Sequence, residues 1–227
     1  MKTVAVIPAL NEAVGLAQTL DEMPASWIGQ VIVVDGGSTD GTPEVARSRG
    51  ARVIVQPRRG YGLACASGAA AASNADAIVF LDADGSDAPA DMPALVEPVH
   101  SGRADLVLGS RLAGRMTPGA MPVHQRFGNW LAGFLIRLLY RVPLTDLSPF
   151  RCVRADVLRA LAMSEMTYGW PTEMIVKAIR RGYRVIEVPV QYRPRAAGRS
   201  KISGTLKGTF LAAYFILGTT LRYAVSR

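Results

Sequence analysis

The sequence has 227 residues, of which 49% are hydrophobic and 19% are charged. This length fits one α/β domain with an appendage, and the composition excludes a disordered or low-complexity chain. The 26 Lys and Arg residues outnumber the 18 Asp and Glu residues, which gives a net charge of +8. A basic excess suits phosphate-bearing partners, which include nucleotides, nucleic acid and anionic membrane surfaces.

Two cysteines occur, Cys65 and Cys152, and both lie in apolar contexts. A disulfide framework is therefore not expected, and the sequence fits a reducing cytosol. The chain passes directly into an apolar run at residues 3–7, without the regions that mark a signal peptide, so we expect none. No uninterrupted apolar stretch reaches the ~20 residues of a membrane span.

Short apolar runs alternate with helical patterns along the first half of the chain. Thr42 is the expected N-cap of the second helix, with Pro43 in its first turn. The alternation predicts an α/β fold with a doubly wound, mostly parallel sheet. The expected strands are 3–7, 30–34, 52–55, 78–81 and 105–109, and the expected helices are 12–23, one from 42, 63–73 and 89–100.

The pattern changes after Gly109. Residues 110–122 contain Gly, Pro and Met without periodicity, and this composition predicts a mobile loop. Beyond it, the sequence predicts helices at 125–141, 154–163 and 171–181, a strand at 184–188 and a final apolar stretch at 205–225.

The apolar run at 78–81 leads directly into Asp82, Asp84 and Asp87. In open α/β sheets, ligands bind outside the carboxyl ends of the strands. Asp82 and Asp84 are two residues apart and would share a face of an extended strand. A hard cation such as Mg²⁺ relieves the repulsion between such carboxylates and completes its shell with water and substrate phosphates. The run alone fits a cation site for a nucleotide diphosphate and an acidic turn equally well.

The first two strands also end in loops with an acid, Glu12 and Asp35. A carboxylate there can accept hydrogen bonds from a nucleobase or a ribose hydroxyl. Taken alone, Glu12 is better explained as a helix-starting acid, and Asp35 fits a turn residue equally well. No Gly-x-Gly-x-x-Gly follows the first strand and no Walker-type loop occurs, so redox chemistry with dinucleotides and ATP hydrolysis lose their usual signatures.

Three loops together resemble those of family 2 glycosyltransferases, which have the GT-A fold. They are residues 6–12 (VIPALNE), 33–42 (VVDGGSTDGT) and 81–85 (LDADG). Residues 109–111 (GSR) and 192–201 (YRPRAAGRSK) resemble the branch of the dolichol-phosphate mannose and glucose synthases. The resemblance extends from about residue 3 to residue 201.

The resemblance implies inverting transfer of a sugar from a UDP- or GDP-sugar, with Mg²⁺ or Mn²⁺ as cofactor. Gly36 stands where the family commonly has a second acid, so base recognition is expected to differ. Ser86 and Asp87 stand where Gln-His is frequent, which makes Asp87 the candidate for a third metal ligand. By similarity, the nucleotide-sugar would be bound by Pro8, Leu10, Glu12, Asp35, Asp82, Ala83 and Asp84, and the metal by Asp82, Asp84 and Asp87.

Four basic residues are candidates for binding the acceptor, namely Arg111, Arg126, Arg195 and Lys201. Arg binds phosphate through a planar fork and Lys binds it as a point charge. In the resembling branch such residues hold the phosphate of a polyprenyl-phosphate acceptor, which is anionic and needs no strong general base. Catalysis would then rest on positioning and on stabilising the leaving diphosphate. Taken singly, each arginine is better explained as a solvated surface charge, whereas Arg195 and Lys201 lie inside a matching motif, which favours a functional role. The expected catalytic residues are Asp84, Arg111, Arg126, Arg195 and Lys201.

We therefore expect a GT-A catalytic domain at 1–204, with a nucleotide-sugar half at 1–110 and an acceptor half at 111–204, followed by an apolar helix at 205–227. The apolar stretches at 131–140 and 209–218 are flanked by basic residues and suit interfacial helices. They predict a cytoplasmic protein held peripherally on the cytoplasmic face of the membrane. Ordinary core packing or a homodimer contact is the alternative for both stretches.

Two other functions stay open. A soluble or glycan hydroxyl acceptor would need a carboxylate base, for which Asp87, Asp146 and Glu173 are candidates. A nucleotide-binding or RNA-binding module without catalysis is the second, but the sequence lacks an aromatic-rich RNA platform and we expect no nucleic-acid partner. Trp170 and Met174 are expected in the core, and Glu173 is expected in a mainly structural role.

Overall fold

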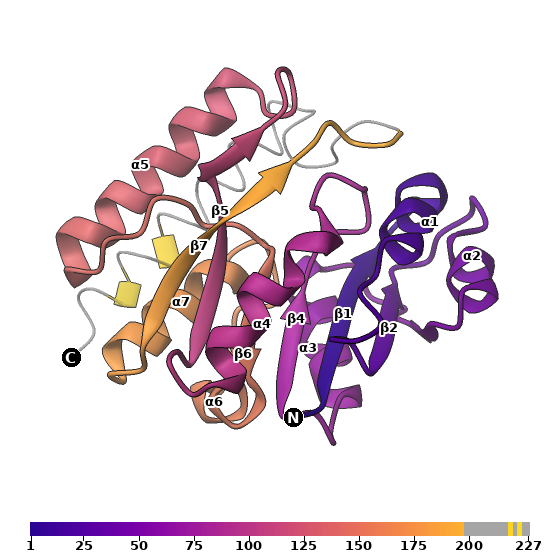
Figure 1. The fold of residues 1–227 in the computed structure, drawn as a ribbon, viewed down its shortest axis with the longest axis horizontal. Helices are drawn as coiled ribbons and strands as arrows, with labels where there is room; N and C mark the ends of the chain where they lie inside the picture. Colours follow the sequence, from indigo (N-terminus) through magenta and orange to yellow (C-terminus); the bar gives the residue numbers. More distant parts are fainter. Residues whose placement is uncertain (198–217, 220–221, 224–227) are drawn as a thin grey trace.

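The computed structural model describes residues 1–197, 218–219 and 222–223 (Figure 1). Most of the expected apolar helix at 205–227 lies outside the described residues, and so does Lys201. Among the described residues, no helix combines the length and the apolarity needed to cross a bilayer.

A seven-stranded sheet forms the centre of the molecule, and helices cover both of its faces (Figure 1). The strands are β1 (Thr3–Ala9), β2 (Gln30–Asp35), β3 (Arg52–Val55), β4 (Ala77–Phe80), β5 (Leu106–Met116), β6 (Arg151–Arg154) and β7 (Val185–Tyr192). The helices are α1 (Ala13–Asp21), α2 (Thr42–Ser48), α3 (Tyr61–Ala71), α4 (Met92–His100), α5 (Val123–Tyr140), α6 (Ala155–Leu161) and α7 (Trp170–Arg180), with a 3-10 turn η1 (Pro89–Asp91) before α4.

The strand order is β3-β2-β1-β4-β6-β5-β7. All neighbouring strands are parallel except β6, which is antiparallel to both β4 and β5. This confirms the expected mostly parallel α/β sheet. In the parallel registers Ala9 lies opposite Asp35, and Val6 lies opposite Phe80. The loops that follow β1, β2 and β4 therefore leave the sheet at the same edge, which is where ligands bind in such folds.

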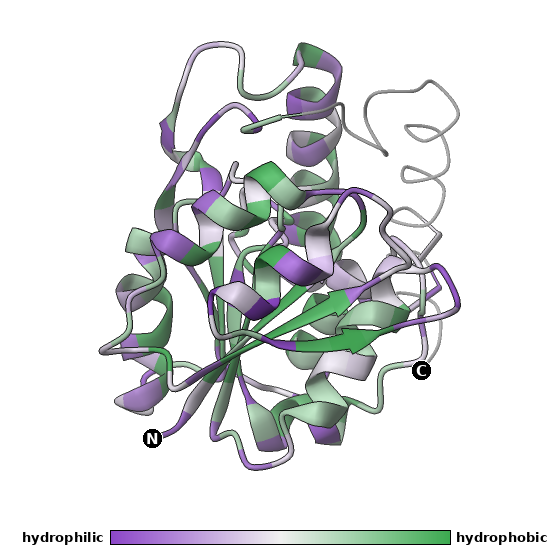
Figure 2. Cartoon of the chain, turned by 90° about the vertical axis from the view of Figure 1, so that its right-hand side faces the viewer, coloured by the Kyte–Doolittle hydropathy of each residue, from purple (hydrophilic) through white to green (hydrophobic). Residues whose placement is uncertain are grey.

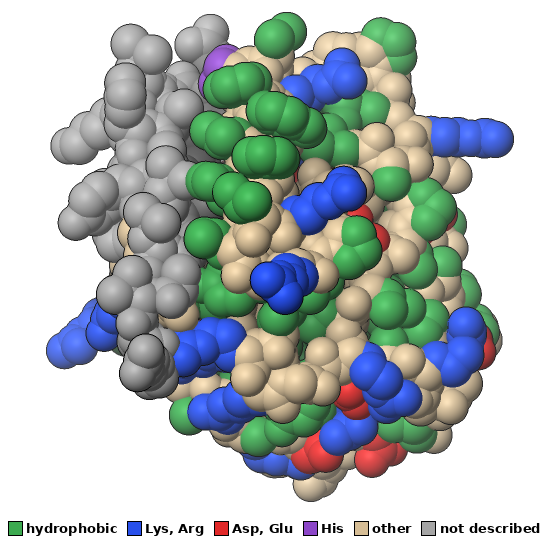
Figure 3. Space-filling view, turned by 90° about the vertical axis from the view of Figure 1, so that its left-hand side faces the viewer, with side chains coloured by type: hydrophobic (Ala, Val, Ile, Leu, Met, Phe, Trp, Pro, Cys, Tyr) green, Lys and Arg blue, Asp and Glu red, His purple; other side chains and the backbone are tan. Residues whose placement is uncertain are grey.

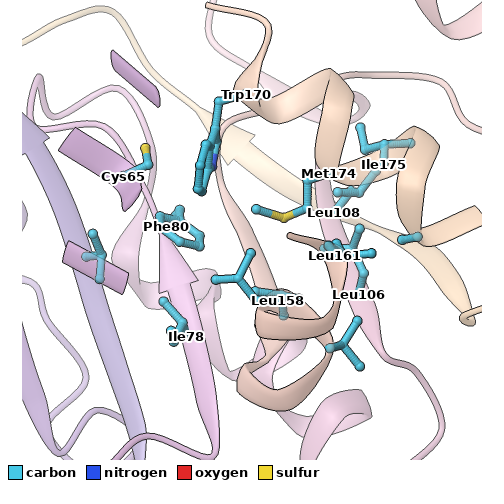
Figure 4. Close-up of a cluster of buried hydrophobic side chains, with 14 of the residues drawn as sticks. Cys65, Ile78, Phe80, Leu106, Leu108, Leu158, Leu161, Trp170, Met174 and Ile175 are labelled. Atoms are coloured by element: carbon cyan, nitrogen blue, oxygen red, sulfur yellow. The ribbon is translucent and has the colours of Figure 1, made fainter. Parts of the chain in front are cut away.

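The core consists of two apolar layers, one on each face of the sheet. Because side chains alternate along a strand, Val4 and Val6 of β1 face one side and Ala5 and Ile7 face the other. The first side packs against α3, α5, α6 and α7, and Figure 4 shows part of this layer around Phe80 and its neighbours. The second side packs against α1, α2 and α4. Figure 2 shows the strongly hydrophobic strands enclosed by helices of mixed polarity.

The mobile loop predicted for residues 110–122 was wrong in its first part, which belongs to strand β5. It extends to Met116, whereas the sequence predicted a mobile loop from residue 110. The second half of β5 pairs with β7, with Met116 opposite Tyr192, after an irregularity between Ser110 and Arg115. The prediction failed because this pairing is long-range and the irregular register hides any local alternation. The expected boundary between the two halves, at 110/111, falls inside this strand.

Three smaller predictions were also wrong. Residues 151–154 form strand β6, so the next helix begins at Ala155 and not at residue 154. The helix expected at 12–23 is limited to Ala13–Asp21. The N-cap of α2 is Gly41, with φ 86°, and not Thr42. The Thr42 hydroxyl cannot cap because it donates to Asp40 Oδ1 at 2.5 Å and accepts a hydrogen bond from the Glu12 backbone N–H at 3.0 Å.

Candidate active site

The acidic loop that follows β4 folds back on itself. Gly85 has φ 76°, a left-handed conformation that glycine adopts at low cost. The backbone N–H of Asp82 donates to Asp87 Oδ2 at 3.2 Å. Asp84 Oδ1 accepts hydrogen bonds from the backbone N–H and the hydroxyl of Ser86, at 2.9 and 2.5 Å. The three expected metal ligands thus lie on one folded loop, with Asp84 and Asp87 buried.

Two of these carboxyl groups, Asp82 and Asp87, have raised pKa values. Burial, followed by the charge of Asp84, raises the pKa of Asp82 to about 7. Burial, followed by the charges of Asp82 and Asp84, raises the pKa of Asp87 to about 8. The charge of Arg111 opposes both shifts. Carboxylates this close are stabilised in their ionised form by a cation.

The residues present fit a hard cation with few protein ligands. The buried oxygen Asp87 Oδ1 has no hydrogen-bond partner in the part of the chain that the structure describes. Within those same residues, no group of three or more His, Cys, Asp and Glu side chains forms a ready cage for a metal ion. Mg²⁺ needs no such cage, because it takes one or two carboxylates and completes its shell with water and phosphate oxygens.

Helix α1 lies directly against the acidic loop. A Cβ atom on Gly15 would lie 2.5 Å from the carbonyl carbon of Asp84 and 2.7 Å from its Cα. Such distances are too short for any side chain, so only glycine allows this approach. Gly15 was not predicted as a site residue, because a lone glycine inside a helical pattern carries no signal of its own.

Tyr61 was also missed. It is the first residue of α3, and its hydroxyl donates to Asp82 Oδ1 at 3.3 Å. Burial and the charge of Asp82 raise the pKa of Tyr61 well above its usual value, so it stays a hydrogen-bond donor. The signal that could have found it is the flanking pair Gly60 and Gly62, which marks a tight entry into the helix at the carboxyl end of β3.

The residues expected to bind the nucleoside lie at the ends of β1 and β2. Pro8 belongs to β1, and Leu10 and Glu12 follow it in the loop before α1. Asp35 ends β2 and is buried, and its carboxylate accepts hydrogen bonds from the backbone N–H groups of Gly37 at 3.0 Å and Ser38 at 3.1 Å. The structure thus gives Asp35 the turn role considered for it, at the edge where the other expected residues gather.

Arg195 bonds to two carboxylates of this edge, those of Glu12 and Asp84. The backbone follows the same course, because the Ala196 N–H donates to the Asp84 carbonyl at 3.0 Å and the Arg193 N–H donates to the Ser86 carbonyl at 2.9 Å. The segment after β7 therefore runs alongside the acidic loop. From the sequence, Arg195 was expected on the acceptor side, whereas in the structure it bonds to two residues expected to bind the nucleotide-sugar.

The other expected cations are distributed differently. Arg111 is buried and forms an ion pair with Asp146, with Nε 2.7 Å from Oδ2. Arg126 is exposed on α5 and forms no ion pair with the described residues. Lys201 lies outside them.

Glu173 has the structural role that was expected. It is buried in α7 and accepts hydrogen bonds from the Ser164 hydroxyl at 2.7 Å and the Tyr223 hydroxyl at 2.7 Å. It also forms an ion pair with Lys177 at 2.8 Å. Burial opposes its ionisation, but these bonds outweigh burial and lower the pKa of Glu173 to about 2. With its oxygens engaged, Glu173 is not available as a general base.

Comparisons with known proteins show the family of the chain. The family model described as Glycosyl transferase family 2 matches residues 4–161. An uncharacterised glycosyltransferase of Mycobacterium tuberculosis is 39% identical over 209 residues, which cover 91% of this chain and 92% of that protein. The undecaprenyl-phosphate mannosyltransferase of Micrococcus luteus is 36% identical over 227 residues, covering 92% and 90% of the two chains.

Among solved structures, glucosyl-3-phosphoglycerate synthase from Mycobacterium tuberculosis, in complex with Mn²⁺, UDP and phosphoglyceric acid, has a TM-score of 0.79. It is 23% identical, and the match covers 100% of this chain and 79% of that one. This likeness shows the fold and confirms the expected GT-A architecture. The chain therefore belongs to glycosyl transferase family 2 and is a glycosyltransferase.

Proposed function

We propose that the protein transfers a hexose from a nucleotide-diphosphate sugar to the phosphate of a polyprenyl-phosphate-like lipid, with Mg²⁺ or Mn²⁺ as cofactor. The observation that carries the proposal is the charge pattern of the site. The acidic loop, which is suited to a cation, is bonded by Arg195 of the segment after β7, and the charge of Arg111 on β5 acts on its carboxylates. Such a pattern fits a metal, a diphosphate and a second anion. The relative from Micrococcus luteus, named for transfer to undecaprenyl phosphate, supports the same acceptor class.

On the donor side, Asp82, Asp84 and Asp87 would hold the metal, which supplies positive charge to the leaving diphosphate. Glu12 and Asp35 lie where a nucleoside would meet the ends of β1 and β2. Their carboxylates can accept hydrogen bonds from the base or the ribose. One oxygen of Asp84 and one of Asp87 accept hydrogen bonds within the loop, and Asp82 accepts one from Tyr61, so these groups stay oriented without ligand.

On the acceptor side, an oxygen of the lipid phosphate would attack the anomeric carbon and form the new C–O bond. The bond from that carbon to the diphosphate oxygen breaks, and the nucleoside diphosphate leaves with inversion at the carbon. The acceptor phosphate carries its own negative charge, so no proton has to be removed. Arg111, Arg126 and Lys201 are the proposed binders of this phosphate.

A hydroxyl acceptor is the second candidate, because the fold is shared with a synthase crystallised with phosphoglyceric acid. That chemistry needs a free carboxylate base near the acceptor oxygen. Two of the three candidate bases are engaged elsewhere, Asp146 by Arg111 and Glu173 by Lys177. Only Asp87 of the three candidates keeps an oxygen without a partner among the described residues. Because Asp87 is also a proposed metal ligand, none of the three carboxylates is left as a free base, and this favours the phosphate acceptor.

Helix α5 supplies the surface on which a lipid acceptor could be reached. One face of it exposes large apolar side chains three or four residues apart, although the rest of the helix packs on the core. Figure 3 shows these side chains gathered on one side of the molecule, with basic side chains close to them. The exposed residues are Val123, Phe127, Trp130, Phe134 and Leu138, and the basic residues of the segment are Arg126, Arg137 and Arg141. An apolar face with basic residues suits peripheral binding at a membrane surface.

The test is a transfer assay with radiolabelled UDP- and GDP-sugars and Mn²⁺, offering a short polyprenyl phosphate or phosphoglycerate in parallel. The proposal expects label in the organic phase after lipid extraction, and only with the lipid phosphate. The Asp84→Ala variant is the negative control, and it should fold but transfer nothing. A labelled phosphoglycerate product in the aqueous phase, separated from the unreacted nucleotide-sugar, would favour the second candidate.

A further inference from the structure

Arg111 of β5 and Asp146 of the loop before β6 form a buried, three-point contact. Arg111 Nε lies 2.7 Å from Asp146 Oδ2, its Nη2 lies 2.8 Å from Oδ1, and its backbone N–H donates to Oδ2 at 3.0 Å. The side chains are 6% and 0% exposed. Bonds from both the fork and the backbone of one residue to one carboxylate fix the position and the rotation of the guanidinium.

The guanidinium of Arg111 is held from a second side as well. Its central carbon lies 5.1 Å from the centre of the Tyr192 ring, within the range of a cation–π contact. The backbone of Tyr192 in turn forms an antiparallel bridge with Asp87. Arg111 is therefore clamped between Asp146 and a tyrosine that is tied to the acidic loop, which places it at the border of the candidate active site.

The loop that carries Asp146 is itself anchored. Glu187 of β7 accepts hydrogen bonds from the backbone N–H groups of Thr145 and Asp146, each at 2.9 Å, and from the Thr145 hydroxyl at 2.8 Å. The hydroxyls of Thr145 and Ser110 are 2.6 Å apart. Two adjacent strands, β5 and β7, thus hold the loop and fix the position of the Asp146 backbone.

We infer that Asp146 is a positioning residue of the transfer reaction, which fixes Arg111 so that the free Nη1–Nη2 edge of its guanidinium binds the acceptor phosphate. The inference rests on the proposed function. Pairing through Nε and Nη2 uses one edge of the fork, and Nη1 forms no hydrogen bond within the described residues. A buried ion pair is a poor device for stability alone, since apolar residues of similar volume serve at least as well. The Arg111–Asp146 pair lies beside the acidic loop, so holding Arg111 for ligand binding explains it better than stability alone.

The chain offers a matched control at the other end of the same strand. Asp105, the residue before β5, is also buried and binds two arginines, Arg154 at 2.7 Å and Arg184 at 3.2 Å. The carboxylate of Asp105 is buried like that of Asp146, although its arginines are more exposed than Arg111, and the cluster lies at the amino end of β5, away from the candidate site. A purely structural role would make the two aspartates equivalent in their effect on transfer.

The experiment is a double-mutant cycle on transfer to a short polyprenyl phosphate, with nucleotide-sugar affinity measured by calorimetry. Asp146→Asn should lower kcat/KM for the acceptor by about 10- to 100-fold and leave the donor affinity unchanged. Because Asp146 acts through Arg111, the Arg111→Gln/Asp146→Asn double variant should lose no more than Arg111→Gln alone. Asp105→Asn should reduce thermal stability without changing kcat/KM.

Additive losses in the cycle, or an equal loss of kcat/KM in Asp105→Asn, would overturn the inference and leave the proposed function standing. A wild type that transfers nothing to the lipid phosphate would overturn both. If Asp146→Asn does not fold, Arg111→Lys reads the same geometry, because lysine keeps the charge and loses the paired bonds to Asp146. It should then raise the acceptor KM, and an unchanged acceptor KM would refute the positioning role.

Discussion

The guanidinium of Arg195 bonds to the carboxylate of Asp84, which lies 111 residues earlier in the chain. Both side chains are largely buried, at 23% and 7% exposure. The same guanidinium reaches Glu12, so that one arginine joins the loop after β1 to the acidic loop after β4. The segment behind β7 therefore closes the edge of the sheet at which the donor residues gather.

The first prediction concerns Arg195. If its guanidinium passes from the carboxylates to the diphosphate, Arg195→Ala should weaken nucleotide-sugar binding by about 10-fold or more, because a charge-assisted hydrogen bond contributes about 1.5–3 kcal/mol. The acceptor KM should not change. Donor affinity is measured by calorimetry and acceptor KM by steady-state transfer.

The matched control is Arg193→Ala, which removes a neighbouring arginine that pairs at 2.7 Å with Glu22, the residue that follows α1. Arg193 also donates to the backbone carbonyl of Asp87 at 3.2 Å, but it bonds to no carboxylate of the acidic loop, so this variant should lose less donor affinity than Arg195→Ala. An effect of Arg195→Ala on the acceptor KM alone would return Arg195 to the acceptor side, where the sequence analysis placed it.

Much of this architecture could be predicted from the sequence. The buried strands and the acids that follow them are local patterns, so the parallel sheet and the gathering of Glu12, Asp35 and Asp84 at one edge were expected. The second half of β5 and strand β6 were not, because each depends on pairing with residues far away in the chain. The hydrogen-bond and ion-pair partners of single side chains could not be predicted from the sequence either. No local pattern shows that Asp146 pairs with Arg111 or that Tyr61 reaches Asp82.

The second prediction concerns pH. The pKa values of Asp82 and Asp87 are raised to about 7 and about 8, mainly by burial. A metal needs these carboxylates deprotonated, so Mn²⁺ affinity should rise steeply from about pH 6 to about pH 8, with release of protons. Calorimetry in buffers of different ionisation enthalpy measures both quantities. A flat affinity across this range would contradict the assignment of these residues to the metal.

The same shifts give a sign for stability. A carboxyl group whose pKa is higher in the folded protein than in the unfolded chain binds more protons when folded. Its contribution to stability is present below the unfolded value near pH 4 and is lost as the pH rises through the folded pKa. Without metal, the contribution of Asp82 and Asp87 should therefore lower the melting temperature as the pH rises from about 4 to about 8. Mn²⁺ should reverse the fall, most strongly at the upper end.

The third prediction concerns the contact between α1 and the acidic loop. Gly15→Ala introduces a Cβ within 2.5–2.7 Å of the Asp84 backbone, so the loop or the helix has to shift. Overpacking of this kind costs about 1–3 kcal/mol of unfolding free energy. Because the displaced atoms belong to Asp84, Mn²⁺ affinity should fall as well. Denaturant titration and calorimetry measure the two effects.

Gly128 in α5 is the matched control, since a Cβ added there meets nothing within 4 Å. Gly128→Ala should be neutral or should stabilise by about 0.4–1 kcal/mol, as expected for a helix interior. If Gly15→Ala keeps both stability and Mn²⁺ affinity, the close approach of α1 does not set the geometry of the acidic loop.

The fourth prediction concerns the exposed face of α5. Trp130 is 54% exposed and stacks against Phe134, with ring centroids 5.7 Å apart, while Phe127 packs on its other side at 5.9 Å. An aromatic row of this kind, held in solvent on a helix whose opposite face is in the core, suits insertion into a bilayer interface. The protein should co-sediment with vesicles that contain anionic phospholipid, and less so at high salt, because the basic residues of the segment are screened.

Trp130→Glu should weaken vesicle binding by roughly 10- to 100-fold, because burial of one large apolar side chain contributes about 1.5–3 kcal/mol. Val14→Glu on α1 is the control, since Val14 is 60% exposed and lies on a different helix, and it should bind vesicles like the wild type. Sedimentation velocity without lipid separates the alternative. If the wild type is a dimer that Trp130→Glu dissociates, and vesicle binding is absent at every salt concentration, then the face of α5 binds a second copy of the chain and the lipid acceptor must be reached in another way.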